Sequence, residues 1–317
     1  MIKYGVGLLL VWLTLSQAVA SEDGWKLVKH SQQAVKTFNF DVSFVQQKAN
    51  HVSTFRWMHG IHQGNGALGI QTELEQLMTQ DGYGTDTFRR DNFVYYAAPD
   101  APVVATLNSS IKELPAILFK SPEVLAKLFD AVPGSSVALS GRNAQLVRLA
   151  ARDPSRYSYW LWLDAETGFP LRVNTVNEEN EVLESWMVVH MQLKPSLPAE
   201  LVGLMNAQLP AEPAALPTDA SSVTAPFTLS WVPAGYDIIS QHQPVMTRSG
   251  RVMASWLLSD GIHQISIFVQ PSNGIADAQA FRDGATTILV VPQQNYDVTV
   301  IGPVNPKIAN QLAVAVQ

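Results

Sequence analysis

The stretch Tyr157-Ser158-Tyr159-Trp160-Leu161-Trp162-Leu163 decides how this chain folds. Side chains along a β-strand alternate between the two faces of a sheet, so the tyrosines and leucines point one way and the tryptophans the other. Both faces of this strand are therefore apolar, whereas an antiparallel sheet normally keeps one face polar and wet. We expect both faces to be covered, either by core on one side and helices on the other, or by a second domain or a ligand. In the last case one face lines an apolar cavity for an acyl chain.

The same stretch belongs to a run of four consecutive antiparallel strands. The turns between them, such as Asp153-Pro154-Ser155, are built from residues that favour tight turns. Adjacent hairpins with helices set apart from them are typical of an α+β fold rather than a parallel α/β fold. The four strands are expected at 142–152, 156–163, 169–176 and 181–193, and earlier strands at 38–44, 52–58, 68–74, 83–89 and 93–98.

Three helices are expected in this first part of the chain. Asp23 can cap a helix that runs to about Lys36. Ser121-Pro122-Glu123 combines a capping hydroxyl, proline at the first helical position and an acid in the first turn, and Pro133-Gly134 is expected to end that helix. A short third helix is expected around 198–207.

The first 20 residues have the pattern of an export signal peptide. A positive start at Lys3 precedes an apolar stretch, and the segment ends Ala18-Val19-Ala20, the small-x-small pattern that signal peptidase cleaves. The apolar stretch is shorter than the roughly 20 residues that a spanning helix needs. We expect cleavage after Ala20, a mature protein that begins at Ser21, and a periplasmic location. An uncleaved membrane anchor is the alternative. The residue after the expected cleavage site is not cysteine, so we do not expect a lipoprotein.

The composition divides the rest of the chain into two domains, 21–206 and 227–317. Repeated prolines with alanine, serine and threonine between them indicate a linker at 207–226. In the second domain, Asp260-Gly261 predicts a two-residue hairpin loop between strands 251–259 and 262–270. A further hairpin is expected from strands 286–291 and 296–301, and a final helix from Asn305-Pro306.

Several classes of function are excluded by composition. The chain has no cysteine, which excludes disulfides, thiol chemistry and cysteine-bound zinc. Its formal net charge is −6 and it has no long basic run, which argues against a nucleic-acid partner. His59 and His62 are interpreted as surface imidazoles in a loop, because a catalytic zinc site needs three protein ligands. No nucleophile elbow, Walker loop or Rossmann glycine pattern is present, so we expect no catalytic residue, metal or cofactor.

Arginines gather in the four-strand region and favour an anionic ligand. Arg148 and Arg152 share a strand face, Arg156 follows across the turn, and Arg172 lies on the next strand. Guanidinium groups bind phosphate through paired N–H donors, although ordinary pairing with surface acids is the alternative. The predicted ligand-binding residues, for an amphiphile with an anionic head, are Arg148, Arg152, Arg156, Arg172, Tyr157, Tyr159, Trp160 and Trp162.

The second domain carries aromatic side chains that either form its core or anchor a protein partner. The predicted partner-binding residues are Trp231, Tyr236, Trp256 and Phe268.

Several motifs, in order along the chain, resemble the RseB/MucB family of periplasmic negative regulators of an envelope-stress sigma factor (sigma-E/AlgU type). The motifs include Arg156-Tyr157-Ser158-Tyr159, Trp162-Leu163-Asp164, Pro170-Leu171-Arg172-Val173, Trp231-Val232-Pro233-Ala234-Gly235-Tyr236 and Ile301-Gly302-Pro303. The resemblance implies a lipoprotein-carrier-like first domain, which is an unclosed antiparallel β-barrel with helices in its concavity. It also implies a smaller α+β domain that grips the periplasmic region of a membrane-spanning anti-sigma factor.

In such a regulator, bound protein shields the anti-sigma factor from proteolysis until lipopolysaccharide or a related lipid releases it. A periplasmic carrier of lipids or lipoproteins is the main alternative, because the first domain alone suits that task. A hydrolase is the third hypothesis and lacks an identifiable nucleophile–base pair. The sequence does not decide whether the protein forms a homo-oligomer.

Overall fold

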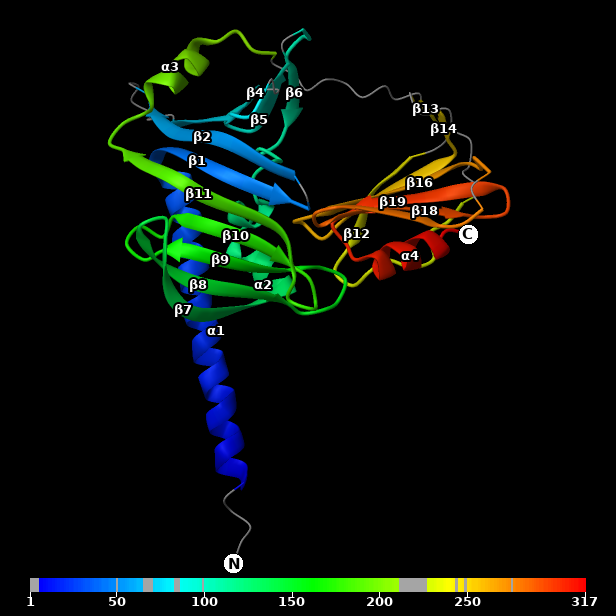
Figure 1. Ribbon diagram of the computed structural model, residues 1–317, viewed down its shortest axis with the longest axis horizontal. Coiled ribbons are helices and arrows are strands. Elements are labelled where there is room, and N and C mark those ends of the chain that lie inside the picture. The colour runs from blue at the N-terminus through cyan, green and yellow to red at the C-terminus, as the bar shows by residue number, and fades with distance from the viewer. Residues whose placement is uncertain are drawn as a thin grey trace, which may run out of the picture.

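The computed structural model describes residues 6–49, 51–64, 71–82, 86–98, 100–210, 227–242, 245–247, 250–274 and 276–317. Two antiparallel sheets dominate it, a large curved one in the first domain and a smaller one in the second (Figure 1). Among these residues no helix combines the length and the apolar character needed to cross a membrane. The expected linker falls largely outside the described residues, because 211–226 are not among them.

The first sheet has eleven strands in the order β6-β5-β4-β3-β2-β1-β11-β10-β9-β8-β7. The edge strands β6 and β7 do not pair with each other, so the barrel stays open. This confirms the predicted unclosed antiparallel barrel. The strands are β1 (Asn39–Lys48), β2 (His51–Gln63), β3 (Gln71–Thr79), β4 (Asp86–Arg90), β5 (Phe93–Ala97), β6 (Val104–Leu107), β7 (Phe129–Leu139), β8 (Arg142–Ala151), β9 (Ser158–Asp164), β10 (Pro170–Val176) and β11 (Val182–Lys194).

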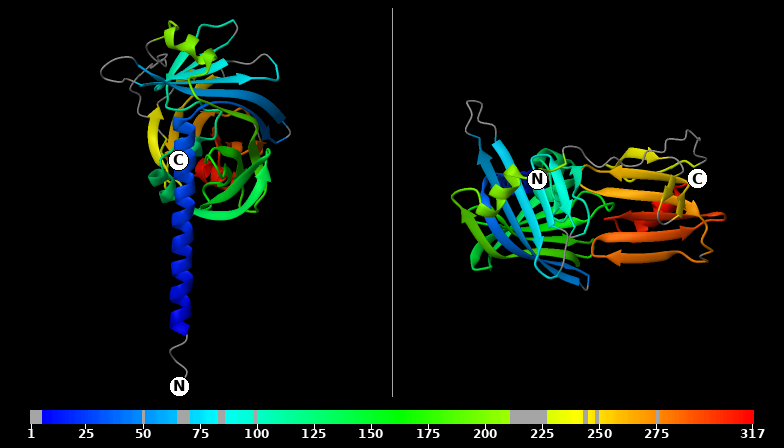
Figure 2. Two further views of the ribbon diagram at one scale, coloured as in Figure 1. Left: turned by 90° about the vertical axis from the view of Figure 1, so that its left-hand side faces the viewer. Right: turned by 90° about the horizontal axis from the view of Figure 1, so that it is seen from above.

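Helical segments fill the concave side of this sheet. They are α1 (Val6–Thr37), the 3₁₀ turn η1 (Ala116–Leu118) and α2 (Pro122–Leu128). Figures 1 and 2 show the sheet curving around α1, whose N-terminal turns project beyond it. Val28 and Val35 of α1 pack with Leu125 of α2 and Leu161 of β9 in one buried core.

Two expected helix ends are wrong. Asp23 caps nothing, because α1 is continuous from Val6 and passes through it. The second helix does not reach Pro133-Gly134. It ends at Leu128, and Phe129 begins β7. The two residues instead lie in an irregularity of the β7–β8 pairing between Pro133 and Ser136, where the missing N–H of proline is tolerated. The start at the Ser121 cap is confirmed, since its side chain accepts from the backbone N–H of Val124.

The outer face of the sheet is covered only in part. Helix α3 (Ala199–Asn206), which confirms the third predicted helix, packs its Leu201 on Met58 and Leu74, and all three side chains are fully buried. Over β8–β10 the outer face carries Trp160 and Trp162, which are only half-buried. We expected both faces of β9 to be covered. Among the described residues nothing covers its outer face, because α3 lies over β2 and β3 instead.

The second sheet has six strands in the order β12-β15-β16-β19-β18-β17, with α4 (Pro306–Val314) packed on β18 and β19. The Asn305 side chain accepts from the backbone N–H of Ile308, which confirms the predicted helix start. The strands are β12 (Asp237–His242), β15 (Ala254–Ser259), β16 (Gln264–Pro271), β17 (Gln279–Asp283), β18 (Thr286–Pro292) and β19 (Tyr296–Gly302), and a separate pair is formed by β13 (Val245–Thr247) and β14 (Gly250–Val252).

The predicted two-residue loop at Asp260-Gly261 is wrong. Ser259 pairs with Gln264, so four residues, 260–263, connect β15 to β16. The Asp260 carboxylate accepts from the backbone N–H groups of Ile262 and His263, at 2.9 and 2.8 Å. A side chain that satisfies the loop backbone in this way stabilises a wider turn than the dipeptide pattern predicts.

Candidate binding site at the domain junction

Polar contacts make up most of the junction between the two domains, and one apolar side chain of the second domain, Ile262, packs in the buried core of the first. The first domain contributes the β8–β9 turn, β9 and β11, and the second contributes the 234–236 turn, the 260–263 loop and the β17–β18 turn. Polar interfaces of this kind between domains of one chain resemble transient protein–protein interfaces, which can separate. The junction is therefore the place where ligand binding and domain position can be coupled.

Arg156 is the central junction residue, with a side chain only 1% exposed. Its guanidinium donates to the Ala234 carbonyl at 2.7 Å, to Asp260 Oδ2 at 3.4 Å, and to the carboxylate of Asp153. It also lies over the Tyr236 ring, 5.7 Å from the centroid. The Arg156 guanidinium thus binds one carboxylate from each domain. Because the group is buried, removing either the cation or a carboxylate leaves an uncompensated buried charge.

Asp260 is held as a carboxylate. Burial alone would raise its pKa, but the His263 imidazole, whose Nδ1 lies 3.7 Å away, and the backbone donors of the loop lower the pKa to about 2. The same burial raises the pKa of Tyr236 above its ordinary value, and the charge of Asp260 adds to the effect. The tyrosine is therefore a neutral hydroxyl at physiological pH.

Two tyrosines of the aromatic strand region reach across to the second domain. The hydroxyl of Tyr159 lies 2.6 Å from His263 Nε2, and the two rings stack with centroids 6.0 Å apart. Burial raises the pKa of Tyr159 well above its ordinary value, so the phenol keeps its proton in this contact. Arg282 donates to the Tyr157 hydroxyl at 3.2 Å. The strand that decides the fold also carries the domain junction.

The β17–β18 turn docks onto β11. Glu184 Oε1 accepts from the backbone N–H of Ala285 at 3.0 Å. Gly284 has φ +58, and a Cβ at that position would lie 2.5 Å from the same carboxylate oxygen. A glycine is therefore required there both for the left-handed backbone and for the close approach.

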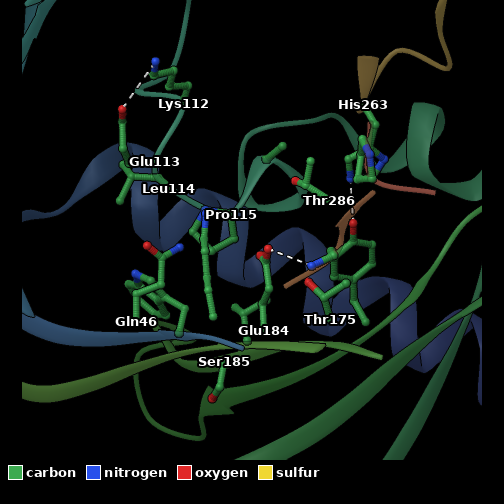
Figure 3. Close-up of a pocket in the computed structure, with 17 residues that line it drawn as sticks. Gln46, Lys112, Glu113, Leu114, Pro115, Thr175, Glu184, Ser185, His263 and Thr286 are labelled. Atoms are coloured by element: carbon green, nitrogen blue, oxygen red, sulfur yellow. Dashed lines mark hydrogen bonds and ion pairs between the residues drawn. The ribbon is translucent and has the colours of Figure 1, made fainter. Parts of the chain in front are cut away.

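A cavity of about 230 Å³ lies at this junction and is walled by both domains. Figure 3 shows Gln46, Glu113 and Leu114 on one side of it, with His263 and Thr286 on the other. Lys48 and Lys112 supply positive charge, and Glu113 and Glu184 supply negative charge. A ligand in this cavity contacts both domains at once, so its affinity depends on their relative position.

Three buried polar atoms among the cavity-lining residues have no hydrogen-bond partner. They are Glu113 Oε2, Trp186 Nε1 and His263 Nδ1. Buried polar groups in native proteins are almost always paired, and each exception needs an explanation. All three atoms are buried, so a ligand in the cavity reaches them only if the surrounding side chains move.

A second cavity of about 410 Å³ lies on the other side of Lys112 and Glu113, which line both. Its walls include the apolar side chains of Phe55, Leu77 and Val104. Lys112 stands over the Tyr96 ring at 5.3 Å and lies 3.8 Å from Glu113. An apolar chamber with charged groups at its boundary suits an amphiphile.

The structure divides the predicted ligand-binding residues into three groups. Arg156, Tyr157 and Tyr159 lie at the junction. Arg152 is exposed and pairs with Asp130 at 2.8 Å, so it follows the surface ion-pair alternative. The remaining group lies on the outer face of β8–β10 and consists of Arg148, Trp160, Trp162 and Arg172. No single rim unites the four arginines.

The predicted partner-binding residues are also dispersed. Trp231 is 38% exposed and Phe268 is half-buried. Tyr236 packs under Arg156 at the junction, and Trp256 is 2% exposed in the core of the second domain. Only the first two are placed to touch a partner while the domains keep this arrangement.

Sequence reasoning missed three junction residues, Glu184, Asp260 and His263. The sequence indicated Asp260 only as part of a hairpin signal, and it pointed to no role for Glu184 or His263. The available clue was the crowding of Asp260 and His263 beside a tight turn, where a carboxylate with spare oxygens can bind elsewhere.

The interpretation of His59 as a loop imidazole is wrong. His59 lies in β2 and is fully buried, and its Nδ1 donates to the Phe38 carbonyl at 2.6 Å. With Glu73 and Glu75 it forms a group whose ligand atoms lie within 4.8 Å of one another. Arg89 donates to both carboxylates, at 2.5 and 2.6 Å. Its guanidinium therefore supplies the positive charge that a metal ion would otherwise supply.

An unclosed antiparallel barrel joined to a small α+β domain, with a cavity walled by both, defines a two-domain binding protein. The sequence model of the MucB/RseB N-terminal domain matches residues 24–212, and that of the MucB/RseB C-terminal domain matches residues 221–317. The chain therefore belongs to the MucB/RseB family.

Relatives cover nearly the whole chain. The sigma-E factor regulatory protein RseB of Salmonella typhimurium is 26% identical over 301 residues, which is 94% of this chain and 92% of that protein. The sigma factor AlgU regulatory protein MucB of Pseudomonas aeruginosa is 23% identical over 324 residues, covering 98% and 96%. The Pseudomonas aeruginosa MucA/MucB complex contains a chain with the same fold, at a TM-score of 0.68 and 21% identity, covering 93% and 98%. The crystal structure of MucB with MucA(peri) gives 0.66 at 20% identity, covering 92% and 97%.

Proposed function

We propose that this protein is a periplasmic negative regulator of an envelope-stress sigma factor. It binds the periplasmic region of a membrane-spanning anti-sigma factor and shields that region from proteolysis. Support comes from relatives named as sigma-factor regulators across nearly the full length, and from a fold shared with MucB of the MucA/MucB complex. The export pattern at residues 1–20 supports the compartment.

The observation that carries the proposal is the cavity walled by both domains. A partner segment in the 230 Å³ cavity touches Tyr159 of the first domain and His263 and Thr286 of the second, so it stabilises the docked arrangement. The two lysines and two glutamates around the cavity suit a peptide that carries both charges. Trp231 and Phe268 remain the candidate anchors of the partner on the second domain.

Release by a lipid is a linked equilibrium. Lipopolysaccharide or another anionic amphiphile can displace the partner only if it binds the partner-free protein more tightly than the complex. The 410 Å³ cavity provides an apolar chamber for an acyl chain, and it shares Lys112 and Glu113 with the junction cavity. Movement of these two residues on lipid binding changes the wall of the partner site, which gives a physical route for the linkage.

A lipid or lipoprotein carrier is the second candidate, and the same apolar cavity favours it. Cleavage of the chain within 207–226 separates the two hypotheses. It abolishes partner binding by a regulator that uses both domains, and it spares transport by a carrier that uses only the first.

The proposed partner site is tested by capture from solubilised inner membranes. The wild-type protein is expected to retain one membrane-spanning protein with a periplasmic region, identified by mass spectrometry. Thr286→Trp fills the junction cavity and is expected to reduce that capture at least tenfold at unchanged thermal stability. Val202→Trp, on the exposed face of α3, is the matched control and is expected to capture normally. Equal capture by both variants contradicts the site, and capture of no membrane protein by the wild type contradicts the function.

A further inference from the structure

The outer face of β8–β10 is an apolar and cationic surface that no described element covers. Two rows of side chains cross it. One runs from Leu146 through Trp162 and Arg172 to Met187, according to the pairing of the four strands. The other runs from Arg148 through Trp160 and Asn174 to Ser185. We call the two tryptophans and two arginines of these rows the outer Trp–Arg patch.

Two neighbouring parts of the outer face differ in how far they are covered. Over β2 and β3, α3 buries Met58 and Leu74 completely. Trp160 and Trp162 lie side by side with ring centroids 6.3 Å apart, and both remain half-buried. A pair of large aromatic side chains left without a covering layer indicates a surface that is covered in another state.

The charges of the patch are unbalanced, although the chain as a whole carries a formal charge of −6. Arg148 is exposed, and neither it nor Arg172 forms an ion pair with a carboxylate of the described residues. Arg172 lies over the Trp162 ring at 5.1 Å and donates to Asn174 at 3.0 Å. Neither row contains an aspartate or glutamate. By contrast, Arg142 and Arg152 nearby each have an acidic partner, at 2.8 Å.

We propose that the outer Trp–Arg patch docks this protein on the surface of an anionic phospholipid bilayer. Indole rings favour the boundary between headgroups and acyl chains, because they are apolar with one polar N–H. Guanidinium groups bind phosphate through paired N–H donors. The two arginines, which form no ion pair among the described residues, complement the negative charge of such a surface. The surface lies on the opposite side of the sheet from both cavities, so docking leaves the partner site open.

Vesicle co-sedimentation tests this inference. The protein is purified from the periplasm of an expressing bacterium and mixed with vesicles of phosphatidylglycerol and phosphatidylethanolamine, or with neutral phosphatidylcholine vesicles. Binding is expected for the anionic vesicles alone and is expected to weaken as salt rises, because screening shortens the reach of the charges. Each arginine near an anionic surface accounts for about fivefold in binding, so Arg148→Gln/Arg172→Gln is expected to weaken binding about 25-fold.

Matched controls make the result decisive. Arg152→Gln removes an exposed arginine of the same sheet that already has an acidic partner, and Trp231→Ala removes an exposed tryptophan of the other domain. Both are expected to bind like the wild type, whereas Trp160→Ser/Trp162→Ser, checked for an unchanged fold by circular dichroism, is expected to lose binding. The inference is overturned if the wild type does not bind anionic vesicles, if the double arginine variant binds as well as Arg152→Gln, or if the double tryptophan variant binds like the wild type. Capture of the membrane partner does not depend on vesicle binding, so the two proposals fail separately.

Discussion

Replacing Arg156 by alanine is expected to destabilise the protein by about 3–5 kcal/mol, since it leaves a buried carboxylate without its cation. The guanidinium is 1% exposed and Asp260 is fully buried, and the two are joined across the domain junction. The Ala234 carbonyl loses its donor in the same variant. Chemical denaturation followed by circular dichroism measures the loss.

Arg152→Ala is the matched control for this prediction. Arg152 stands four residues earlier and forms an ion pair with Asp130, but both side chains are about half exposed, at 48% and 53%. Exposed ion pairs contribute at most about 1 kcal/mol. Equal destabilisation by the two variants contradicts the role given to the junction. A loss of the Tyr159–His263 contact in Arg156→Ala, detected by nuclear magnetic resonance of the imidazole, is expected because the domains then separate.

Replacing Arg89 by methionine is the second change with a large expected effect, about 3–5 kcal/mol of destabilisation. Arg89 is 3% exposed, and it is the hydrogen-bond donor that holds the buried Glu75 and the adjacent Glu73. In its absence Glu75, which is 1% exposed and already has one unpaired oxygen, keeps a buried charge without compensation. Urea denaturation at neutral pH measures the change.

The double variant Arg89→Met/Glu75→Leu distinguishes a charge effect from a packing effect. Replacing both members of a buried ion pair by apolar residues of similar size is often neutral or stabilising. We therefore expect the double variant to recover most of the loss of the single one, with a coupling free energy of at least about 1 kcal/mol. A double variant as unstable as Arg89→Met alone contradicts the assignment.

The first sheet could be predicted from sequence because its information is local. Alternation along 157–163 and the turns on either side define the hairpins, and the pairings of β8 to β11 follow them closely. The start of α2 was predictable for the same reason, since Ser121 caps a helix that begins at the next residue, Pro122. Its end was not, because Phe129 pairs with Ala151, and that partner is distant in sequence.

The junction could not be predicted, since its contacts join residues far apart in the chain. Arg156 and Asp260 are 104 positions apart, as are Tyr159 and His263. Sequence indicated that Arg156 was near an aromatic strand and that Asp260 was in a turn, but no pattern related the two. The same limit explains why the four arginines predicted to form one rim lie in three different places. Alternation along a strand predicts which face of the sheet a side chain is on, but it does not predict which other part of the chain covers that face.

Release of the anti-sigma factor requires that the partner segment and an anionic amphiphile bind this protein in a linked way. Isothermal titration of the purified protein with the periplasmic region of the anti-sigma factor of the same bacterium, with and without saturating lipopolysaccharide, tests this directly. We predict binding in the absence of lipid and an affinity at least tenfold lower in its presence. An unchanged affinity with lipid bound contradicts the release mechanism, and no binding in either condition contradicts the proposed function.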